Sequence, residues 1–420
     1  MSLVDTPAVL DSAARTAAPL RILQVVSAYY PAVRYGGPIR SVHGLCVALA
    51  RRGHDVRVYT TSVDGETDLD VPVDRPVEVD GVLVHYFRVP AFRRLWWAPR
   101  LGRRLRETMH EFDVVHIHGV FLWPMFAAAR AAARARVPYV IAPRGMLIRD
   151  LINRKSRWAK TAWINAIERK SLARAAAIHV TAEMEATELE ALGLPTPRVT
   201  CIPNGVESLA AWKPISDTPF SRLPQRYVLF LSRISWKKGL DRLITAWQWV
   251  PDIPLVIAGN DDEAYQPKLV ELARSLGLSD RVIFVGPAHD ADKWALYSRA
   301  QLFVLPSYSE NFGNVVAEAM AMGCPVAVTP EVGIASLVES CGAGIVTGGE
   351  PREFASAVRD LLESPTRLRE MGIRGKQAVR ERLSWEAVAQ ATEQLYRQII
   401  GTRAPLAPIA GAQVATNACR

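Results

Sequence analysis

Two acidic side chains lie eight residues apart in the stretch SYSENFGNVVAEAMAMG, residues 307–323. Glu310 falls among turn-forming residues, whereas Glu318 falls inside an apolar run that predicts a helix with Asn314 as its N-cap. The first backbone amides of such a helix have no intrahelical acceptor and suit a phosphate. Glu310 could reach sugar hydroxyls over the same spot, and Glu318 could accept from the vicinal hydroxyls of a ribose. Compensation of the helix dipole explains Glu318 poorly, because that effect fades beyond the first turn.

Two cationic side chains flank a short loop in SRISWKKGLDRL. Arg233 directly follows an apolar run, and Lys238 comes five positions later, just before a glycine. Such a pair beside a helix start could clamp a diphosphate leaving group. Lys237 precedes Lys238, so the sequence leaves open which lysine points inward, and a solvated surface is the alternative interpretation.

A glycine pair precedes a predicted helix near the N-terminus. Gly36 and Gly37 stand before Pro38, a favourable first helical residue. Glycines there let the backbone approach a ligand and present amides to an anion. A plain turn is the alternative, and the dinucleotide fingerprint G-x-G-x-x-G is missing.

Two histidines alternate in the run HIHG. Side chains in a strand alternate with period two, so His116 and His118 share one face. We expect His118 at the end of the strand that faces the site and His116 in a structural role. Arg144, in the loop APRGML after the next apolar run, could hold an anionic group of an acceptor or a neighbouring carboxylate.

The residues above follow apolar runs that are typical of strands buried on both faces of a parallel sheet. In the first half these runs are 21–27, 55–61, 82–89, 113–119, 137–143, 176–181 and 198–203. After a stretch with several prolines the pattern restarts at 227–233, 254–259, 281–286, 301–307 and 325–330. Two successive series of strands and helices predict an α/β fold with two Rossmann-like domains facing a central cleft, where ligands bind beyond the carboxyl ends of the strands.

The domain boundaries follow from the same pattern. We expect a flexible lead-in over 1–19, a first domain over 20–205, a linker over 206–222 and a second domain over 223–384. By analogy with such folds, a last helix over 385–401 would pack back on the first domain, ahead of a flexible tail over 402–420.

Composition excludes several classes of protein. The chain has 420 residues, of which 49% are hydrophobic and 22% charged, as in a globular protein of two domains. Its five cysteines are scattered without a C-x-x-C pair, which argues against a disulfide framework or a structural zinc site. The N-terminus lacks the basic-then-apolar order of a secretory signal, and no apolar run approaches the roughly 20 residues of a membrane span. We therefore expect a cytoplasmic protein.

The net charge of +9 lies entirely in the first half of the chain. Residues 1–200 hold 28 Lys and Arg against 19 Asp and Glu, whereas residues 201–420 hold 23 of each. Seven arginines crowd 88–106 beside Trp96 and Trp97, and a second basic stretch covers 149–170. Arginine among aromatic residues suits an anionic membrane surface. A solvated basic face is the alternative; no base-reading motif supports nucleic acid as a partner.

The motifs described above, in their order along the chain, resemble those of the family-4 (group 1) retaining glycosyltransferases of GT-B fold. They are Gly36-Gly37, Arg233-x4-Lys238-Gly, and Glu310-x7-Glu318 followed by Ala-Met-x-x-Gly-x-Pro. The segment IPNGV at 202–206 is similar to theirs as well, and the resemblance covers about residues 20–400. It implies transfer of a sugar from a nucleoside diphosphate sugar to a hydroxyl acceptor, with retention of configuration and without a metal or cofactor.

The resemblance also implies roles for individual residues. Arg233 and Lys238 would bind the diphosphate, Glu310 the sugar, and Glu318 the ribose. His118 would face the reacting sugar, and Arg144 is a candidate acceptor residue. The remaining donor-binding candidates are Gly36, Gly37, Asn311, Phe312, Gly313, Asn314 and Val315. The basic first domain would suit a lipid-linked or polysaccharide precursor as acceptor, reached at the cytoplasmic face of a membrane.

Other functions fit the same scaffold less well. A nucleotide-sugar epimerase would need acid and base groups at the sugar and no acceptor site. A non-catalytic nucleotide-sugar-binding protein would not need both acids and both cations. A nucleic-acid-binding protein would show salt-dependent DNA binding without sugar turnover.

Overall fold

The structure is a computed structural model that describes residues 18–32, 37–73, 75–149, 152, 157–207, 220–250, 252–288 and 290–402. Five predicted features therefore lie wholly or partly outside the described residues: the lead-in over 1–19, Gly36, most of the 206–222 linker, residues 150, 151 and 153–156 of the second basic stretch, and the tail over 402–420.

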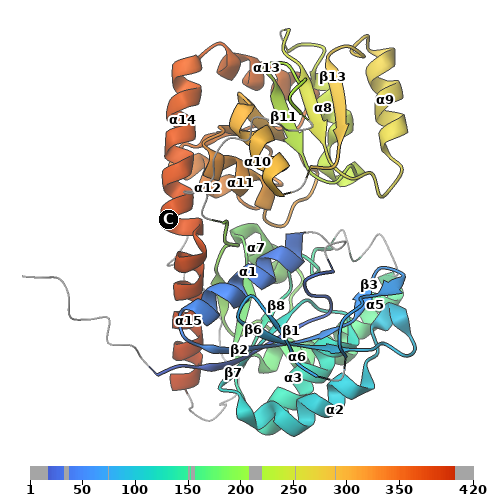
Figure 1. Ribbon diagram of the computed structural model, residues 1–420, viewed down its shortest axis with the longest axis vertical. Coiled ribbons are helices and arrows are strands. Elements are labelled where there is room, and N and C mark those ends of the chain that lie inside the picture. Colours follow the sequence, from blue (N-terminus) through green and yellow to red (C-terminus); the bar gives the residue numbers. More distant parts are fainter. Residues whose placement is uncertain are drawn as a thin grey trace, which may run out of the picture.

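The first domain is built on an eight-stranded sheet, the lower half of the molecule in Figure 1. Its strands run in the order β10 (Val199–Cys201), β9 (Ala177–Val180), β8 (Tyr139–Ala142), β7 (Val114–His118), β1 (Arg21–Val26), β2 (Asp55–Thr61), β6 (Val82–Phe87) and β5 (Val77–Val79). All pairs are parallel except β5 with β6. A short hairpin, β3 (Val63–Asp64) and β4 (Thr67–Asp68), stands apart from this sheet.

Helices cover both faces of the first sheet. The face that holds Leu23 and Ile117 packs against α2 (Pro99–Thr108), α3 (Trp123–Ala135) and α6 (Arg169–Arg174). The opposite face, with Ile22 and Val114, packs against α1 (Gly37–Arg51) and α15 (Trp385–Gly401). Side chains alternate along a strand, so every second residue points to the same face. Gln24, in β1 with Ile22, and His116 and His118, in β7 with Val114, therefore lie on the face that α15 covers. The other α-helices formed by the described residues of this domain are α5 (Arg157–Trp163) and α7 (Glu183–Ala191).

The second domain holds a six-stranded parallel sheet around one hydrophobic core. The strands run in the order β13 (Val282–Gly286), β12 (Leu255–Ala258), β11 (Val228–Leu231), β14 (Leu302–Leu305), β15 (Val326–Val328) and β16 (Gly344–Val346). Its helices are α8 (Leu240–Ala246), α9 (Gln266–Ser275), α10 (Asp290–Arg299), α11 (Asn314–Met322), α12 (Ala335–Cys341), α13 (Pro351–Leu362) and α14 (Pro365–Ala378).

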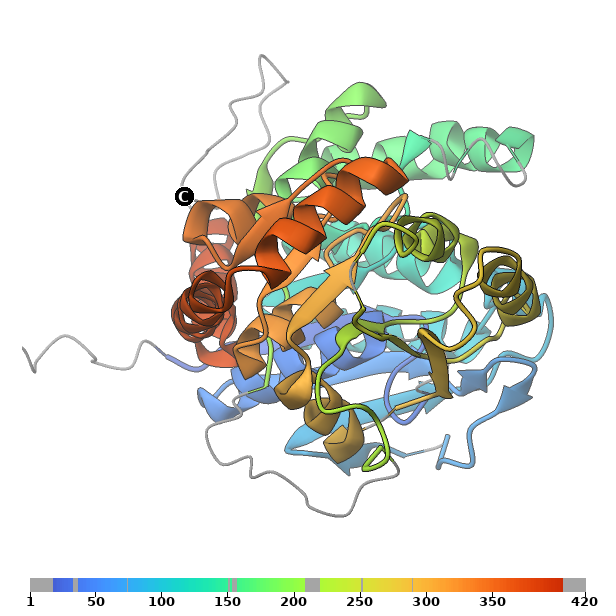
Figure 2. The same ribbon diagram turned by 90° about the horizontal axis from the view of Figure 1, so that it is seen from above.

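The last two helices form a column along one side of both domains (Figure 1). α14 packs on the second domain and α15 on α1 of the first, and the view from above looks down this column (Figure 2). Trp385 at the start of α15 lies against Gly44 and Gly205, where any Cβ atom would overlap its indole ring. Glycine at both positions therefore allows α15 to seat on the first domain.

The fold class predicted from the sequence is confirmed, and each predicted strand is present. The short strands β3, β4, β5 and β16 escaped prediction because two or three residues are too few to give a recognisable apolar run. Among the described residues, no helix combines the length and the hydropathy that crossing a membrane requires.

Candidate active site

The loop after β14 is fixed by backbone hydrogen bonds to the segment that follows β15. Glu310 donates its N–H to the carbonyl of Glu331 at 3.0 Å, and its own carbonyl accepts from Gly333 at 2.9 Å. The Glu310 carboxylate pairs with Lys238. Their side chains are 20% and 12% exposed, so the pair lies near the surface but is largely shielded from water.

Lys238 ends a 3-10 turn, Trp236–Lys238, that packs against the same loop. Gly239 adopts φ 66°, and a Cβ atom there would overlap the carbonyl oxygen of Pro306. Glycine is therefore required for the turn to approach the loop closely enough for Lys238 to reach Glu310. The tertiary structure thus settles which lysine points inward.

The two other cations of this stretch are placed differently. Lys237 lies with its ammonium 6.0 Å from the centre of the Trp236 ring. Burial and, to a lesser degree, the nearby charge of Arg233 lower the pKa of Lys237. Arg233 itself is exposed and has no ion-pair partner among the described residues, so its guanidinium is available to an anion.

The start of α11 differs from the sequence prediction. Gly313, at φ 99°, is the N-cap, and Asn314 is the first helical residue; the prediction of Asn314 as N-cap is wrong. Its side chain accepts instead from Asn204 Nδ2 at 3.0 Å. A Cβ atom at Gly37 would lie 2.8 Å from Asn314 Nδ2. The N-terminus of α11 therefore touches the first domain at two points, and the side chain of Asn314 is used for that contact rather than for capping.

Glu318 lies one turn inside α11 and is held by α10. Lys293 Nζ donates to Glu318 Oε1 at 2.8 Å, and the Tyr297 hydroxyl donates to Oε2 at 3.3 Å. Burial raises the pKa of Tyr297 well above its usual value, so the phenol stays protonated. The sequence analysis missed both partners; their spacing of four residues on one helix was the available signal.

Asn311 connects the same loop to the first domain. Its Nδ2 donates to Thr181 Oγ1 at 2.8 Å, and Gly145, at φ 72°, leaves room for the Asn311 side chain. Glu185, which is 3% exposed, accepts from the backbone N–H groups of Gly145 and Thr181 at 2.6 and 2.9 Å. The carboxylate of Glu185 thus shapes the surface that receives Asn311. The neighbouring candidates Phe312 and Val315 are buried and partly buried in the second core.

Arg144 lies within the first domain and is linked to the second through Asn204, which bonds Asn314. Its backbone has φ 56°, unusual for a residue with a side chain, and its guanidinium turns inward. One terminal nitrogen donates to Asn204 Oδ1 at 2.7 Å and the other lies 3.1 Å from His118 Nδ1. Burial lowers the pKa of Arg144 to about 10, so it stays charged at neutral pH.

The His118 ring is 4% exposed and uses both of its nitrogens within the protein. Nδ1 faces Arg144, and Nε2 lies 2.7 Å from Gln24 Oε1. Burial first, and then the charge of Arg144, lower the pKa of His118 well below its ordinary value. The imidazole is therefore neutral, with no ring nitrogen left to take a proton from a ligand.

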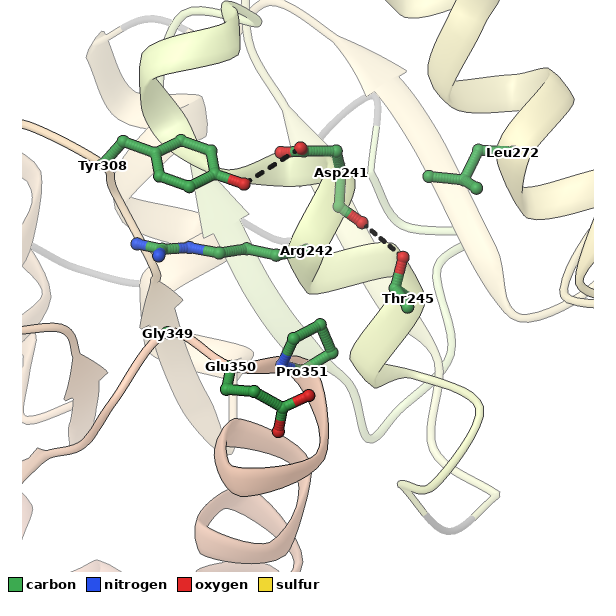
Figure 3. Close-up of a pocket in the computed structure, with 8 residues that line it drawn as sticks. All are labelled: Asp241, Arg242, Thr245, Leu272, Tyr308, Gly349, Glu350 and Pro351. Atoms are coloured by element: carbon green, nitrogen blue, oxygen red, sulfur yellow. Dashed lines mark hydrogen bonds between the residues drawn. The ribbon is translucent and has the colours of Figure 1, made fainter.

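A hollow of about 580 Å³ lies behind the Glu310 loop, between α8, α9 and the start of α13 (Figure 3). Arg242 stacks 4.1 Å from the centre of the Tyr308 ring and donates to the carbonyls of Pro306 and Ser307 at 2.7 and 2.6 Å. Tyr308 donates to Asp241 at 3.0 Å. These contacts brace the loop, and the hollow contains none of the predicted site residues.

The structure therefore groups the predicted residues into separate sets. Lys238 contacts Glu310, Gly37 approaches Asn314, and Arg144 contacts His118, while Glu318 pairs with a lysine that the sequence did not single out. Within the described ranges, no three His, Cys, Asp or Glu residues lie close enough together to hold a metal ion. Metal independence itself stays a prediction.

Family models match both halves of the chain. The model described as "Glycosyl transferase 4-like domain" matches residues 36–205, and "Glycosyl transferases group 1" matches residues 215–378. A glycogen synthase of Mycobacterium tuberculosis is 30% identical over 407 residues, which cover 90% of this chain and 94% of that protein.

Two solved structures show the same fold. A sucrose-phosphate synthase from Thermosynechococcus elongatus superposes with a TM-score of 0.71 and 24% identity, covering 90% of this chain and 99% of the other. The Anabaena protein HepE, in complex with UDP and glucose, gives a TM-score of 0.71 and 21% identity, covering 90% and 100%. At these identities the likeness concerns the arrangement of the two domains.

Proposed function

Because the chain belongs to the group 1 glycosyltransferases and has their GT-B fold, we propose that it transfers a sugar from a nucleoside diphosphate sugar to a hydroxyl acceptor, with retention and without a metal. The observation that carries the proposal is the ion pair between Lys238 and Glu310 beside the N-terminus of α11. It joins a cation for the leaving group and an acceptor of sugar hydroxyls at one point.

We place the donor diphosphate against Lys238, Arg233 and the amides of Gly313, Asn314 and Val315. Negative charge grows on the diphosphate as its bond to the anomeric carbon breaks. Fixed cations and helix amides stabilise that charge without reorganisation. A diphosphate within reach of Lys238 would compete with Glu310 for the ammonium group.

This competition links the two parts of the donor. Once phosphate oxygens take over Lys238, the carboxylate of Glu310 becomes free to accept hydrogen bonds from the hydroxyls of the sugar. Glu318 remains oriented by Lys293 and Tyr297 and keeps lone pairs for the ribose. Donor binding would thus rearrange one acid and leave the other in place.

The donor can be identified by thermal shift. UDP and UDP-glucose are the first ligands to test because HepE is seen with UDP and glucose. We expect one nucleoside diphosphate to raise the melting temperature, and its sugar ester to yield a product whose anomeric configuration matches the donor. Free epimerised nucleotide sugar without transfer, or binding without turnover across sugars and acceptors, would contradict the proposal.

We further propose that the acceptor is a lipid-linked or polysaccharide precursor, reached by docking the first domain on the anionic cytoplasmic face of a membrane. Phe92 is 70% exposed, Leu95 is 44% exposed, and Trp158 on α5 is 86% exposed. Arg93, between the first two, is held by Asp68 at 3.0 Å and by the carbonyl of Gly65 at 3.3 Å. The segment that exposes Phe92 and Leu95 is therefore held in place through Arg93, and further arginines follow it in the sequence.

Vesicle binding tests this surface. Arg94, Arg103 and Arg106 are exposed, unlike Arg93, and their joint replacement by Gln should abolish cosedimentation with vesicles that contain anionic lipid. Replacement of Arg367, Arg369 and Arg380, exposed on the second domain, serves as the control. Equal binding to neutral vesicles, or no binding to anionic ones, would leave a solvated basic face and favour a soluble acceptor.

A further inference from the structure

Buried polar side chains of the first domain form a hydrogen-bonded chain that begins at Arg144 and His118. It links Arg144, His118, Gln24, Tyr396, His116 and His179, and it ends on the carbonyl of Ile202. Successive distances are 3.1 Å (Arg144 to His118), 2.7 Å (His118 to Gln24), 3.1 Å (Gln24 to Tyr396), 2.7 Å (Tyr396 to His116), 3.2 Å (His116 to His179) and 2.8 Å (His179 to Ile202). The four side chains from β1, β7 and β9 lie on the face of the sheet that α15 covers, and α15 contributes only Tyr396.

The direction of every hydrogen bond in this chain is fixed by its two ends. Arg144 can only donate, so His118 Nδ1 accepts and the proton of this ring sits on Nε2. The carbonyl of Ile202 can only accept, so His179 carries its proton on Nε2 and accepts at Nδ1. Each end thus sets the direction of the hydrogen bonds next to it, and the two directions must be compatible at the residue where they meet.

They agree at Tyr396. His116 must donate from Nε2 to His179, so its Nδ1 accepts from the Tyr396 hydroxyl. Gln24 accepts from His118 with Oε1 and donates from Nε2 to the oxygen of Tyr396. A hydroxyl is the group in the chain that both accepts and donates through one atom, which the meeting point requires.

Burial keeps the three imidazoles neutral. His116, His118 and His179 are 0%, 4% and 2% exposed, and Tyr396 is fully buried. Burial lowers the pKa of His179 to about 3 and the pKa values of the other two well below their ordinary range. With one proton on each ring, the chain has a single consistent arrangement of hydrogens.

We propose that Tyr396, near the end of the C-terminal helix, is a positioning residue of the active site: its hydroxyl holds the Gln24 side chain so that His118, whose tautomer Arg144 sets, keeps one ring orientation. The inference rests on the proposed function in that the sugar of the donor would have to bind over His118, as the family resemblance implies. Arg144 extends the effect, since its other nitrogen binds Asn204, which donates to Asn314 at the start of α11.

The test compares Tyr396→Phe with Tyr59→Phe. Both residues are fully buried tyrosines of the first domain's core, and the Tyr59 hydroxyl bonds Thr108 at 2.9 Å, away from the chain. Each variant loses one buried hydroxyl, but Tyr396→Phe breaks two hydrogen bonds and Tyr59→Phe one, so we expect the larger loss in melting temperature for Tyr396→Phe. We expect Tyr396→Phe alone to lower kcat, by roughly 10-fold or more, with little change in the KM for the donor. The second domain, which holds the donor, is not altered.

A spectroscopic arm does not depend on turnover. Two-bond ¹H–¹⁵N correlation of ¹⁵N-histidine protein reports each ring's tautomer, and loss of a signal in His118→Gln assigns that ring. We expect the Nε2–H form of His118 in all three proteins, because Arg144 sets it, and a shifted His118 Nε2 signal in Tyr396→Phe alone, because its partner Gln24 loses the bond that orients it. If the unaltered protein transfers no sugar, the proposed function fails while these spectra still decide the inference.

Two results would overturn the inference. One is a protonated or Nδ1–H His118 in the unaltered protein. The other is a Tyr396→Phe variant whose His118 signal matches that of Tyr59→Phe, and whose kcat also does if transfer is observed.

Discussion

At the junction between the domains, the polar groups of the second domain are charged and paired, whereas those of the first are mostly neutral and deeply buried. Lys238 and Glu310 come from two loops of one sheet edge, and Lys293 and Glu318 from adjacent helices. The chain under His118 instead joins residues as far apart as Gln24 and Tyr396, 372 positions along the sequence.

The two regions differ in how easily a polar group can exchange its protein partner for a ligand or for water. A member of an ion pair near the surface can exchange its partner for a charged or polar ligand, because the ligand supplies the charge or hydrogen bond that is lost. A buried neutral hydrogen bond has no water to replace a lost partner, and breaking it leaves an unsatisfied group. We therefore expect substitutions in the two ion pairs of the second domain to change ligand binding and turnover. Substitutions in the buried hydrogen-bonded chain of the first domain should instead change side-chain orientation and the stability of the fold.

The largest effect should come from Lys238→Ala. Removing one electrostatic donor to the leaving group should cost about 2.7–4 kcal/mol of transition-state stabilisation, measured as the loss in kcat/KM. Lys237→Ala, beside it but directed at Trp236, is the matched control and should lose far less. Turnover of Lys238→Ala within about threefold of the unaltered enzyme, at matched stability, would remove Lys238 from the site.

The next effect concerns Glu393, where charge in the first domain serves stability. Burial would raise the pKa of this carboxyl, but hydrogen bonds from Arg397, Arg52 and His54 outweigh burial and hold it at about 2. Its contribution is present above the unfolded pKa near 4.5 and is lost as the pH falls toward about 2.

Glu393→Gln should therefore lower the free energy of unfolding by about 2–3 kcal/mol at neutral pH, with the difference shrinking between pH 5 and 2. Urea unfolding across this range measures it, and Glu363→Gln, exposed at the end of α13, is the control. A constant difference at every pH would mean that packing, not charge, is lost.

The two acids of the second domain should separate in their effects. Glu318→Ala should weaken the nucleoside diphosphate by roughly 1.5–3 kcal/mol, the value of a hydrogen bond to a charged group. Glu310→Gln should lower turnover with a limited effect on nucleotide affinity, because the sugar and not the nucleotide loses its partner. Calorimetric titration distinguishes them; if both variants bind nucleotide normally and only melt earlier, the acids are structural.

The smallest expected effect is that of a chelator. Fixed cations at Lys238 and Arg233 take the place of a divalent ion in the proposed clamp, so activity should persist in excess EDTA. Loss of activity that magnesium or manganese restores would contradict the proposed clamp. The charged groups of the second domain would then not suffice to bind the diphosphate.

The sequence alone determined the fold class, because strand alternation and the restart of the strand–helix series are local patterns. It also singled out Glu310, Glu318, Lys238 and the glycines, since they lie in the loops after strands or in the helices that begin there, at the sheet edge where ligands bind in such folds. Its family resemblance is confirmed by the matches to both halves.

Only the tertiary structure decided which partner each group takes. Propensity favoured Asn314 as an N-cap, but a contact with Asn204, 110 residues away, claims its side chain and leaves Gly313 to cap. Nothing local marks Tyr396 as the neighbour of Gln24 and His116, because a tyrosine on an apolar helix face looks like any core residue. Such pairings depend on how α15 packs across the first sheet, and packing between distant segments leaves no periodic trace in the chain that forms it.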